Sequence, residues 1–308
     1  MERIRRFLQT KVIVNPIAGA GRTAKKWPQI MALLKSIGLR FEHDLTEAPG
    51  HAIELARSAA KEGCELVVSV GGDGTINEIV NGLYDAGSIG DVMLGIISTG
   101  AGNDYIRTIG IPRHHEEACR CLTNPRKLLV DLGVVEYENS GQMVKRLFVN
   151  FAGLGFDAEV VKATTQRFKA LGSLPSYLMG LLTTLLFYEN KQVFLKLDGQ
   201  AEERKVCTIL MSNGKYGGGG MFAAPNADPM DGLFDVLIID DLSKPDLLRS
   251  LPRIYRGTHL THPKVTVKRA REIEVRPAQR MSLQADGELL GEAPARFHVL
   301  PAALNVVI

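Results

Sequence analysis

The glycine-rich segment Gly71-Gly72-Asp73-Gly74-Thr75 constrains the fold of this 308-residue chain more than any other feature. It follows Leu66–Val70, a mostly β-branched and apolar run that predicts a buried strand, and it precedes Ile76–Leu83, whose pattern predicts a helix. Glycines at the carboxyl end of a parallel strand let the backbone approach a ligand, and the N-terminus of the next helix offers unpaired N–H groups. Such a turn suits phosphate. The carboxylate of Asp73 would repel a bare phosphate, so it favours a contact mediated by Mg²⁺.

Two more turns of this kind follow predicted strands. Lys11–Val14 ends at Asn15-Pro16, and Leu94–Ile97 is followed by Gly100–Asp104. One glycine-rich turn alone could be an ordinary connection between a strand and a helix. Several strands that end in glycine and polar residues are more informative, because the carboxyl ends of parallel strands share the edge of the sheet where ligands bind.

The pattern of strands and helices predicts two domains. In the first part, strands alternate with helices such as 27–37 and 52–62, which predicts an α/β domain with a mostly parallel sheet covered on both faces. Beyond about residue 131 short strands dominate, which predicts a β-rich, mainly antiparallel, sandwich-like domain. We therefore expect domains at 1–133 and 134–308. The expected strands of the second are 128–135, 146–151, 193–197, 207–212, 234–239, 265–268, 273–275 and 296–300, with helical segments at 157–188 and 244–255.

Composition limits the partners and the compartment. The formal net charge of +3 is too small to indicate a nucleic-acid-binding protein. The four cysteines form no C-x-x-C pair, and no secretory signal is evident, so a reducing cytoplasm is expected. The most apolar run, Leu178–Tyr188, is shorter than the roughly 20 residues of a spanning helix. Its length and periodicity favour a buried helix stripe over an amphipathic surface that lies on a membrane.

Several well-known phosphate and cofactor motifs are missing from the sequence. It contains no G-x-x-x-x-G-K-[ST], no protein-kinase H-R-D with D-F-G and no G-x-S-x-G. The Rossmann pattern G-x-G-x-x-G is matched only in part by Gly19-Ala20-Gly21. A dehydrogenase of the Rossmann type is therefore the least favoured alternative.

The order of the motifs resembles that of the bacterial diacylglycerol-kinase-like lipid kinases, whose catalytic domain shares its fold with NAD kinases. The resemblance covers nearly the whole chain. It rests on Asn15-Pro16, Gly71–Thr75 with Asn77-Glu78, Gly102-Asn103-Asp104 with Arg107, Ser212-Asn213-Gly214, Gly218–Met221, Pro225-Asn226-Ala227, Asp231–Asp235, His259–Val265 and Asp286-Gly287-Glu288.

This resemblance implies an ATP- and Mg²⁺-dependent lipid kinase. Such an enzyme transfers the γ-phosphate to a hydroxyl group of diacylglycerol or a related membrane lipid, with its site in the cleft between the two domains. The implied partners are ATP and a lipid at a membrane surface, without nucleic acid. The implied location is cytoplasmic and peripheral, at the inner face of the membrane. A homodimer formed through the sheet edges of the β-rich half is conceivable.

The resemblance also implies roles for individual residues. Gly71–Thr75 would bind the ATP phosphates with Mg²⁺, and Asn15, Gly100 and Asn103 would line the nucleotide site. Glu288 would act as the general base, because a hydroxyl that attacks phosphorus must lose its proton. Aspartates would hold magnesium through a network of carboxylates and waters, and one of them would also form a structural Mg²⁺ site. The network comprises Asp73, Asp104 and Asp231, and the structural site comprises Asp231 with backbone oxygens near Leu233.

Two positions depart from the family pattern. Ala20 stands where many relatives carry lysine, and Ala101 stands where they carry threonine. Arg22 and Lys169 are candidates to replace the missing positive charge. These departures motivate one alternative, a non-catalytic regulator that binds nucleotide. A kinase of a soluble acceptor such as NAD is the other. Asp231 and Glu288 could also be ordinary residues of Asp-Gly turns.

Overall fold

The computed structural model describes residues 9–123, 125–167 and 173–308, so Lys169 lies outside the described residues. The chain divides into two compact units. The first unit comprises the residues up to Asp131 together with Pro301–Ile308, and the second comprises Leu132–Leu300. The chain leaves the first unit within strand β5 (Lys127–Asn139) and returns to it within strand β15 (Ala295–Val307).

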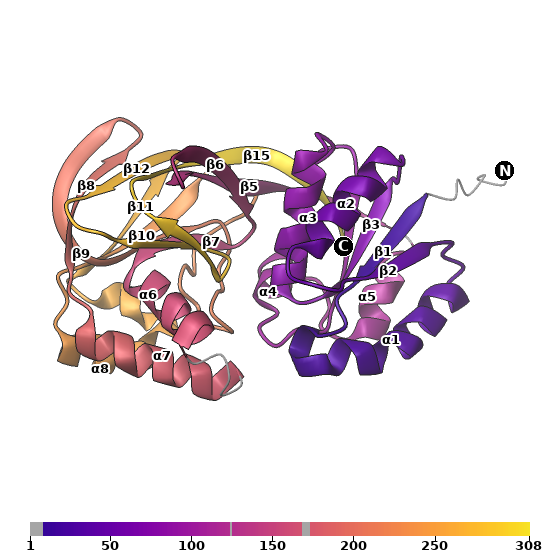
Figure 1. The fold of residues 1–308 in the computed structure, drawn as a ribbon, viewed down its shortest axis with the longest axis horizontal. Coiled ribbons are helices and arrows are strands. Elements are labelled where there is room, and N and C mark those ends of the chain that lie inside the picture. Colours follow the sequence, from indigo (N-terminus) through magenta and orange to yellow (C-terminus); the bar gives the residue numbers. More distant parts are fainter. Residues whose placement is uncertain (1–8, 124, 168–172) are drawn as a thin grey trace. The chain divides into compact units, whose positions relative to one another are not determined.

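A parallel sheet forms the centre of the first unit (Figure 1). Its strands pair in the order β2-β1-β3-β4, and the end of β15 adds to β4 in parallel through Asn305 and Met93. Every residue of β3 and β4 is buried, as expected for strands covered on both faces. The predicted α/β region is thereby confirmed. The bounds are β1 Thr10–Val14, β2 Glu42–Leu45, β3 Leu66–Gly71 and β4 Met93–Ser98.

Helices cover both faces of this sheet (Figure 1). On one face, α1 (Ala18–Ser36) and α5 (His115–Cys121) pack on the side chains of alternate strand residues. On the other face, α2 (His51–Lys61) packs closely against α3 (Asp73–Asp85). A Cβ at Gly82 would lie 2.3 Å from the Ile53 carbonyl oxygen, so the approach of these two helices requires glycine. Helix α4 (Asp104–Ile109) follows the turn after β4.

The second unit is β-rich and mainly antiparallel, as predicted. Its main ladder runs β14-β13-β7-β9-β8-β12-β15. Off this ladder, β10 pairs with β9 and β11 with β10, while β5 pairs with β15 and β6 with β5. Its α-helices within the described ranges are α6, α7 and α8, with a π-helical segment at Ala163–Arg167 and a 3-10 segment at Thr258–Thr261. The bounds are β6 Gln142–Phe148, β7 Phe151–Gly155, α6 Phe156–Lys162, α7 Ser173–Phe187, β8 Lys191–Leu197, β9 Gln200–Ser212, β10 Phe234–Asp240, α8 Lys244–Ile254, β11 Val265–Ala270, β12 Glu272–Pro277, β13 Ser282–Ala285 and β14 Glu288–Glu292.

The strand predicted at 146–151 is in fact two strands, so that prediction was wrong. The chain leaves β6 and bends before β7, because the N–H groups of Val149 and Asn150 donate to the carboxylate of Asp286. At this bend the Asp286 carboxylate thus accepts the N–H groups that would otherwise donate to the carbonyl groups of a neighbouring strand. The bend matters for the site described below, because Asp286 begins the turn that carries Glu288.

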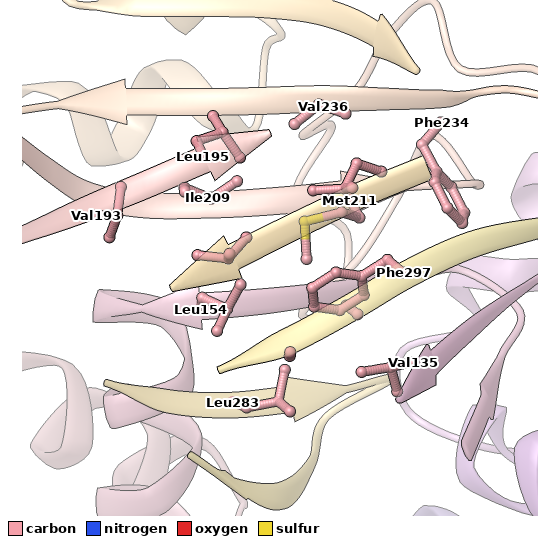
Figure 2. Packing of buried hydrophobic residues seen from close by; sticks show 14 of the residues in the cluster. Val135, Leu154, Val193, Leu195, Ile209, Met211, Phe234, Val236, Leu283 and Phe297 are labelled. Carbon is pink, nitrogen blue, oxygen red and sulfur yellow. The ribbon is translucent and has the colours of Figure 1, made fainter. Parts of the chain in front are cut away.

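The core of the second unit lies between its strands (Figure 2). Ile209 and Met211 of β9 point into this core beside Leu154 and Phe297 (Figure 2). The intervening Leu210 packs on the opposite side, in a cluster that includes residues of α6, α7 and α8. Because successive side chains of a strand point to opposite faces, the second half of β9, Val206–Ser212, is buried on both sides.

The cysteines behave mostly as small core residues. All four are free, and three of them, Cys64, Cys119 and Cys207, are buried. Burial raises the pKa of the Cys119 thiol to about 11 and that of the Cys207 thiol to about 12. These two thiols therefore stay protonated and unreactive near neutral pH.

Replacing Phe297 by alanine tests the core of the second unit. The ring is 1% exposed, so Phe297→Ala should lower the free energy of unfolding by about 3–5 kcal/mol through lost burial and a residual cavity. Phe194 of β8, which is 37% exposed, provides the matched control. Phe194→Ala should cost less than about 1.5 kcal/mol. Urea unfolding followed by circular dichroism measures both, and equal losses would contradict this packing.

Candidate active site

The glycine-rich turn after β3 touches the turn after β4. The N–H groups of Thr99 and Gly100 donate to the carbonyl oxygen of Gly71 at 2.7 and 3.1 Å. A Cβ at Gly100 would lie 2.6 Å from the Cα of Gly72, and a Cβ at Gly71 would lie 2.4 Å from the Thr75 hydroxyl oxygen. Glycine is thus required at position 100 because two backbones meet there, and at position 71 because the Thr75 side chain fills the space of a Cβ.

The carboxylate of Asp73 holds the beginning of α4. It accepts the N–H groups of Asp104 and Tyr105 at 3.2 and 3.1 Å. Asn103, just before this helix, has a left-handed φ of +56°, and the hydroxyl of Ser98 donates to its side chain. Asp104 is buried, whereas Asp73 remains partly exposed. Asp73 can therefore organise the turn and still present an oxygen to a ligand.

Asn15 brings the turn after β1 to the same place. Its side-chain amide donates to the Thr75 hydroxyl at 3.0 Å, and its main-chain N–H donates to Val70 at 2.9 Å. The side-chain oxygen of Asn15 is buried and has no hydrogen-bond partner within the described part of the chain. A buried amide oxygen without a partner is costly. This atom is suited to coordinate a cation or to accept a bond from a ligand.

Arg22 links the turn after β1 to the turn after β4. Its guanidinium donates to the carbonyl oxygens of Gly19 and Gly100, both at 3.0 Å. Gly19, Ala20 and Gly21 all have left-handed φ angles, of 61°, 57° and 81°. Ala20, one of the two departures from the family pattern, therefore occupies a conformation that costs a residue with a Cβ about 1–2 kcal/mol. A positive charge does lie at these turns, and it belongs to Arg22.

Glu288 belongs to the second unit, where it begins β14. A tight turn precedes it, formed by Asp286 and Gly287 with φ angles of 47° and 83°. The Glu288 carboxylate pairs with the guanidinium of Arg146 at 2.7 Å, and its side chain is 38% exposed. Arg146 thus directs a carboxylate that remains open to solvent.

Two further side chains fix the turn that carries Glu288. Asp286 accepts the N–H groups of Val149, Asn150 and Phe151 at 2.7, 3.0 and 3.1 Å. The side-chain oxygen of Gln284 accepts the N–H of Gly287 at 2.9 Å. Together these bonds hold the turn from both sides.

Gln284 connects this turn to a buried acid. Its side-chain amide donates to Asp157 at 2.9 Å, and the Thr208 hydroxyl donates to the other oxygen of Asp157 at 2.6 Å. Burial raises the pKa of the Asp157 carboxyl group, while the two hydrogen bonds oppose that rise. Sequence analysis missed Arg146, Asp157 and Gln284. The only available signal was a polar residue within a short strand, as at Gln284.

The predicted metal ligands Asp231 and Leu233 form a turn with a different partner. One oxygen of Asp231 accepts the N–H of Leu233 at 3.0 Å, and the other pairs with the guanidinium of Arg269. Arg269 already supplies the positive charge that a metal would bring, so this arrangement does not fit a cation as it stands. Within the described residues, no three His, Cys, Asp or Glu side chains are grouped to hold a metal. The metal site at Asp231 stays a prediction.

The first unit does bring together most of the predicted nucleotide-site residues. Its oxygen donors suit Mg²⁺, which prefers octahedral oxygen ligands and is often bound by one or two carboxylates together with substrate phosphates. The partly exposed Asp73 and the unpaired oxygen of Asn15 supply such donors. The N-terminus of α3 adds a positive dipole end for phosphate. The gathered residues are Asn15, Gly71, Gly72, Asp73, Thr75, Gly100, Asn103 and Asp104, with Gly74 next along α3.

Comparison with known proteins matches both halves of the chain to families. Residues 9–135 match the diacylglycerol kinase catalytic domain. Residues 150–308 match the YegS C-terminal NAD kinase beta sandwich-like domain. The two matches follow one another along nearly the whole chain, in agreement with the α/β and β-rich regions of the fold.

Relatives of similar length align over nearly the whole chain. A diacylglycerol kinase of Bacillus subtilis (strain 168) is 29% identical over 97% of this chain and 96% of its own length. A diacylglycerol kinase of Mycobacterium tuberculosis is 30% identical, over 96% and 93%. A crystal structure of a diacylglycerol kinase from Bacillus anthracis str. Sterne shares the fold, with a TM-score of 0.73, 22% identity and coverage of 98% and 97%.

Substitutions at two glycines test the contact between the turns. Gly100→Ala should lower the free energy of unfolding by about 1–3 kcal/mol, because the new methyl group overlaps the backbone at Gly72. Gly74→Ala is the matched control, since nothing lies within 4 Å of a Cβ there. It lies within α3 and should be neutral or stabilising by up to about 1 kcal/mol. Chemical denaturation measures both, and a harmless Gly100→Ala would show that the turns do not touch.

Proposed function

We infer the reaction of this chain from its family, because it belongs to the bacterial diacylglycerol kinase family of lipid kinases. We propose that it transfers the γ-phosphate of ATP to a hydroxyl group of diacylglycerol or a closely related membrane lipid. One observation supports this proposal most strongly. The three turns after β1, β3 and β4 converge through Asn15–Thr75, Gly72–Gly100 and Arg22–Gly100 contacts.

The first unit is proposed to bind the nucleotide, since a diacylglycerol kinase catalytic domain implies the use of ATP. The absence of side chains at Gly71, Gly72 and Gly100 leaves main-chain groups free to approach phosphate oxygens. The N-terminus of α3 attracts negative charge, and the guanidinium of Arg22 adds a formal positive charge. Positioning and charge neutralisation of this kind account for most of the catalysis in phosphoryl transfer.

Asp73 and Asn15 are the residues proposed to hold Mg²⁺. Mg²⁺ would neutralise charge on the phosphate oxygens. Asp73 is kept in place by the N–H groups at the start of α4, so its direction does not depend on a ligand. Asp104 lies buried behind it and could contribute only through water, as the network of the family pattern suggests.

Glu288 is proposed to be the general base. As the lipid hydroxyl oxygen bonds to the γ-phosphorus, the bond from that phosphorus to the bridging oxygen of ADP breaks, and the Glu288 carboxylate takes the hydroxyl proton. Arg146 directs this carboxylate, and the bonds of Asp286 and Gln284 fix the turn beneath it. The reaction thus needs the nucleotide turns of the first unit and the base of the second.

Incubation with radiolabelled ATP and a lipid extract, followed by separation of the products, tests the reaction. Label in a lipid that co-migrates with a phosphorylated diacylglycerol is the expected result. Label in NAD with none in lipid would instead identify a kinase of a soluble acceptor. ATP binding without turnover on any lipid would identify a regulator, the reading that Ala20 and Ala101 motivate.

Glu288→Gln tests the base. The change keeps the shape of the side chain and removes its ability to accept a proton, so we expect turnover to fall by about 10²–10⁴-fold. The affinity for ATP should stay unchanged, because the nucleotide is assigned to other residues. Glu292→Gln, on the same strand and paired with Arg280, is the matched control and should keep its turnover. Full activity in Glu288→Gln would contradict the assignment of Glu288 as the general base.

A further inference from the structure

Helix α7 presents large apolar side chains to solvent. It carries no charged residue along Ser173–Phe187, although the exposed side of a helix in a globular protein is ordinarily polar. The sequence pattern favoured a buried stripe over this segment, and the structure buries only part of it. The exposed large side chains are Leu178 at 47%, Met179 at 42%, Leu182 at 49%, Leu186 at 64% and Phe187 at 78%.

Small residues of α7 occupy the side that faces the protein. Ser176, Gly180 and Thr184, spaced four apart, are buried. A Cβ at Gly180 would lie 2.5 Å from the hydroxyl oxygen of Thr164, so the helix is packed closely along this line. The inward side of α7 thus combines these small residues with the buried Leu185, while Leu182 and Leu186 face outward. Large apolar side chains therefore lie on the outer side as well, where a surface helix is ordinarily polar.

The neighbouring helix α8 adds apolar and basic residues. It packs against α7 and exposes Leu248, and Tyr255 directly after it is also exposed. Segment 244–256 contains four basic residues and one acidic residue, Asp246. The Lys244 ammonium group donates to the carbonyl oxygen of Leu186, which places a positive charge at the end of the exposed face of α7. The basic residues are Lys244, Arg249, Arg253 and Arg256.

We propose that this surface of α7 and α8 docks the protein on an anionic lipid bilayer. An apolar helix face with basic residues beside it is the arrangement by which interfacial helices bind membranes, with apolar side chains below the headgroups and cations among them. No helix in the described ranges is long and apolar enough to cross a bilayer, so the contact is with the surface. The charges select this occupant over a second copy of the chain, because the surface would meet its own positive charges in a symmetric pair.

This inference rests on the proposed function, because a lipid substrate stays in the bilayer while its hydroxyl group is phosphorylated. It goes further by naming the surface that brings the enzyme to the lipid. The surface acts apart from the nucleotide turns and from Glu288, so binding to vesicles can be measured without ATP and without an acceptor lipid.

Sedimentation of the full chain with vesicles tests the surface. One set contains phosphatidylcholine alone and the other an equimolar mixture with phosphatidylglycerol, and neither contains diacylglycerol. The double variant Leu182→Gln, Phe187→Gln should weaken partitioning to the mixed vesicles by about tenfold or more. Met143→Gln on β6, at 68% exposure in the same unit, is the matched control and should bind as the wild type does.

The basic residues are tested separately. Arg249→Gln with Arg256→Gln should weaken binding to the phosphatidylglycerol vesicles by about fivefold per charge and reduce its salt dependence, without changing binding to phosphatidylcholine. Wild-type protein that stays in the supernatant with both vesicles would overturn the proposal. So would an apolar double variant that binds vesicles normally but loses a dimer in analytical ultracentrifugation.

A short-chain, water-soluble diacylglycerol separates this inference from the proposed kinase reaction. Both double variants should phosphorylate it at the wild-type rate, because the docking surface is then unnecessary. If no variant and no wild-type protein phosphorylates any lipid while vesicle binding follows the expected pattern, the kinase proposal fails and the docking surface stands. If phosphorylation proceeds but vesicle binding ignores α7 and α8, the docking surface fails alone.

Discussion

The close approach of two backbones, at Gly72 and Gly100, is the contact on which the candidate nucleotide site depends. Adjacent parallel strands lie about 4.8 Å apart, so the turns that follow them normally separate as soon as side chains intervene. Glycine at both positions removes that obstacle. Asp73 can then hold the start of α4, and Arg22 can bond to the Gly100 carbonyl. The absence of side chains at these two glycines thereby allows the Asp73 carboxylate, the Arg22 guanidinium and the start of α4 to lie around one backbone contact.

The second unit obtains a rigid turn in a different way. Its carboxylate Asp286 collects three main-chain N–H groups from a bend between two strands, so the rigidity comes from charge-assisted hydrogen bonds. Gln284 extends the support to the buried Asp157. Arg146 then fixes the carboxylate of Glu288 from a strand that is 142 residues away in the sequence. The pairing with Arg146 therefore orients the Glu288 carboxylate within the second unit itself.

The parts of the fold that sequence analysis predicted well are local. The buried run Leu66–Val70, the glycines after it and the helical spacing that follows lie within twenty residues of one another, and each carries its own signal. The roles of Arg146 and Gln284 depend on partners far along the chain, and no pattern in a single sequence joins them. The prediction of a buried stripe on helix α7 was only partly correct, for another reason. Apolar residues of this helix lie on both its buried and its exposed sides, so their spacing indicates a helix without identifying the outward face.

The first unit is not a continuous piece of chain, and this affects how it can be made. Its sheet contains Asn305 and Val306, which pair with β4 only after the whole second unit has been synthesised. The Asp131 carboxylate likewise accepts a hydrogen bond from the N–H of Ala302, which can form only after the second unit has been synthesised. On the ribosome, the glycine turns therefore belong to an incomplete sheet until residues 301–308 emerge. The sheet of the first unit can thus be completed only after the second unit has been synthesised.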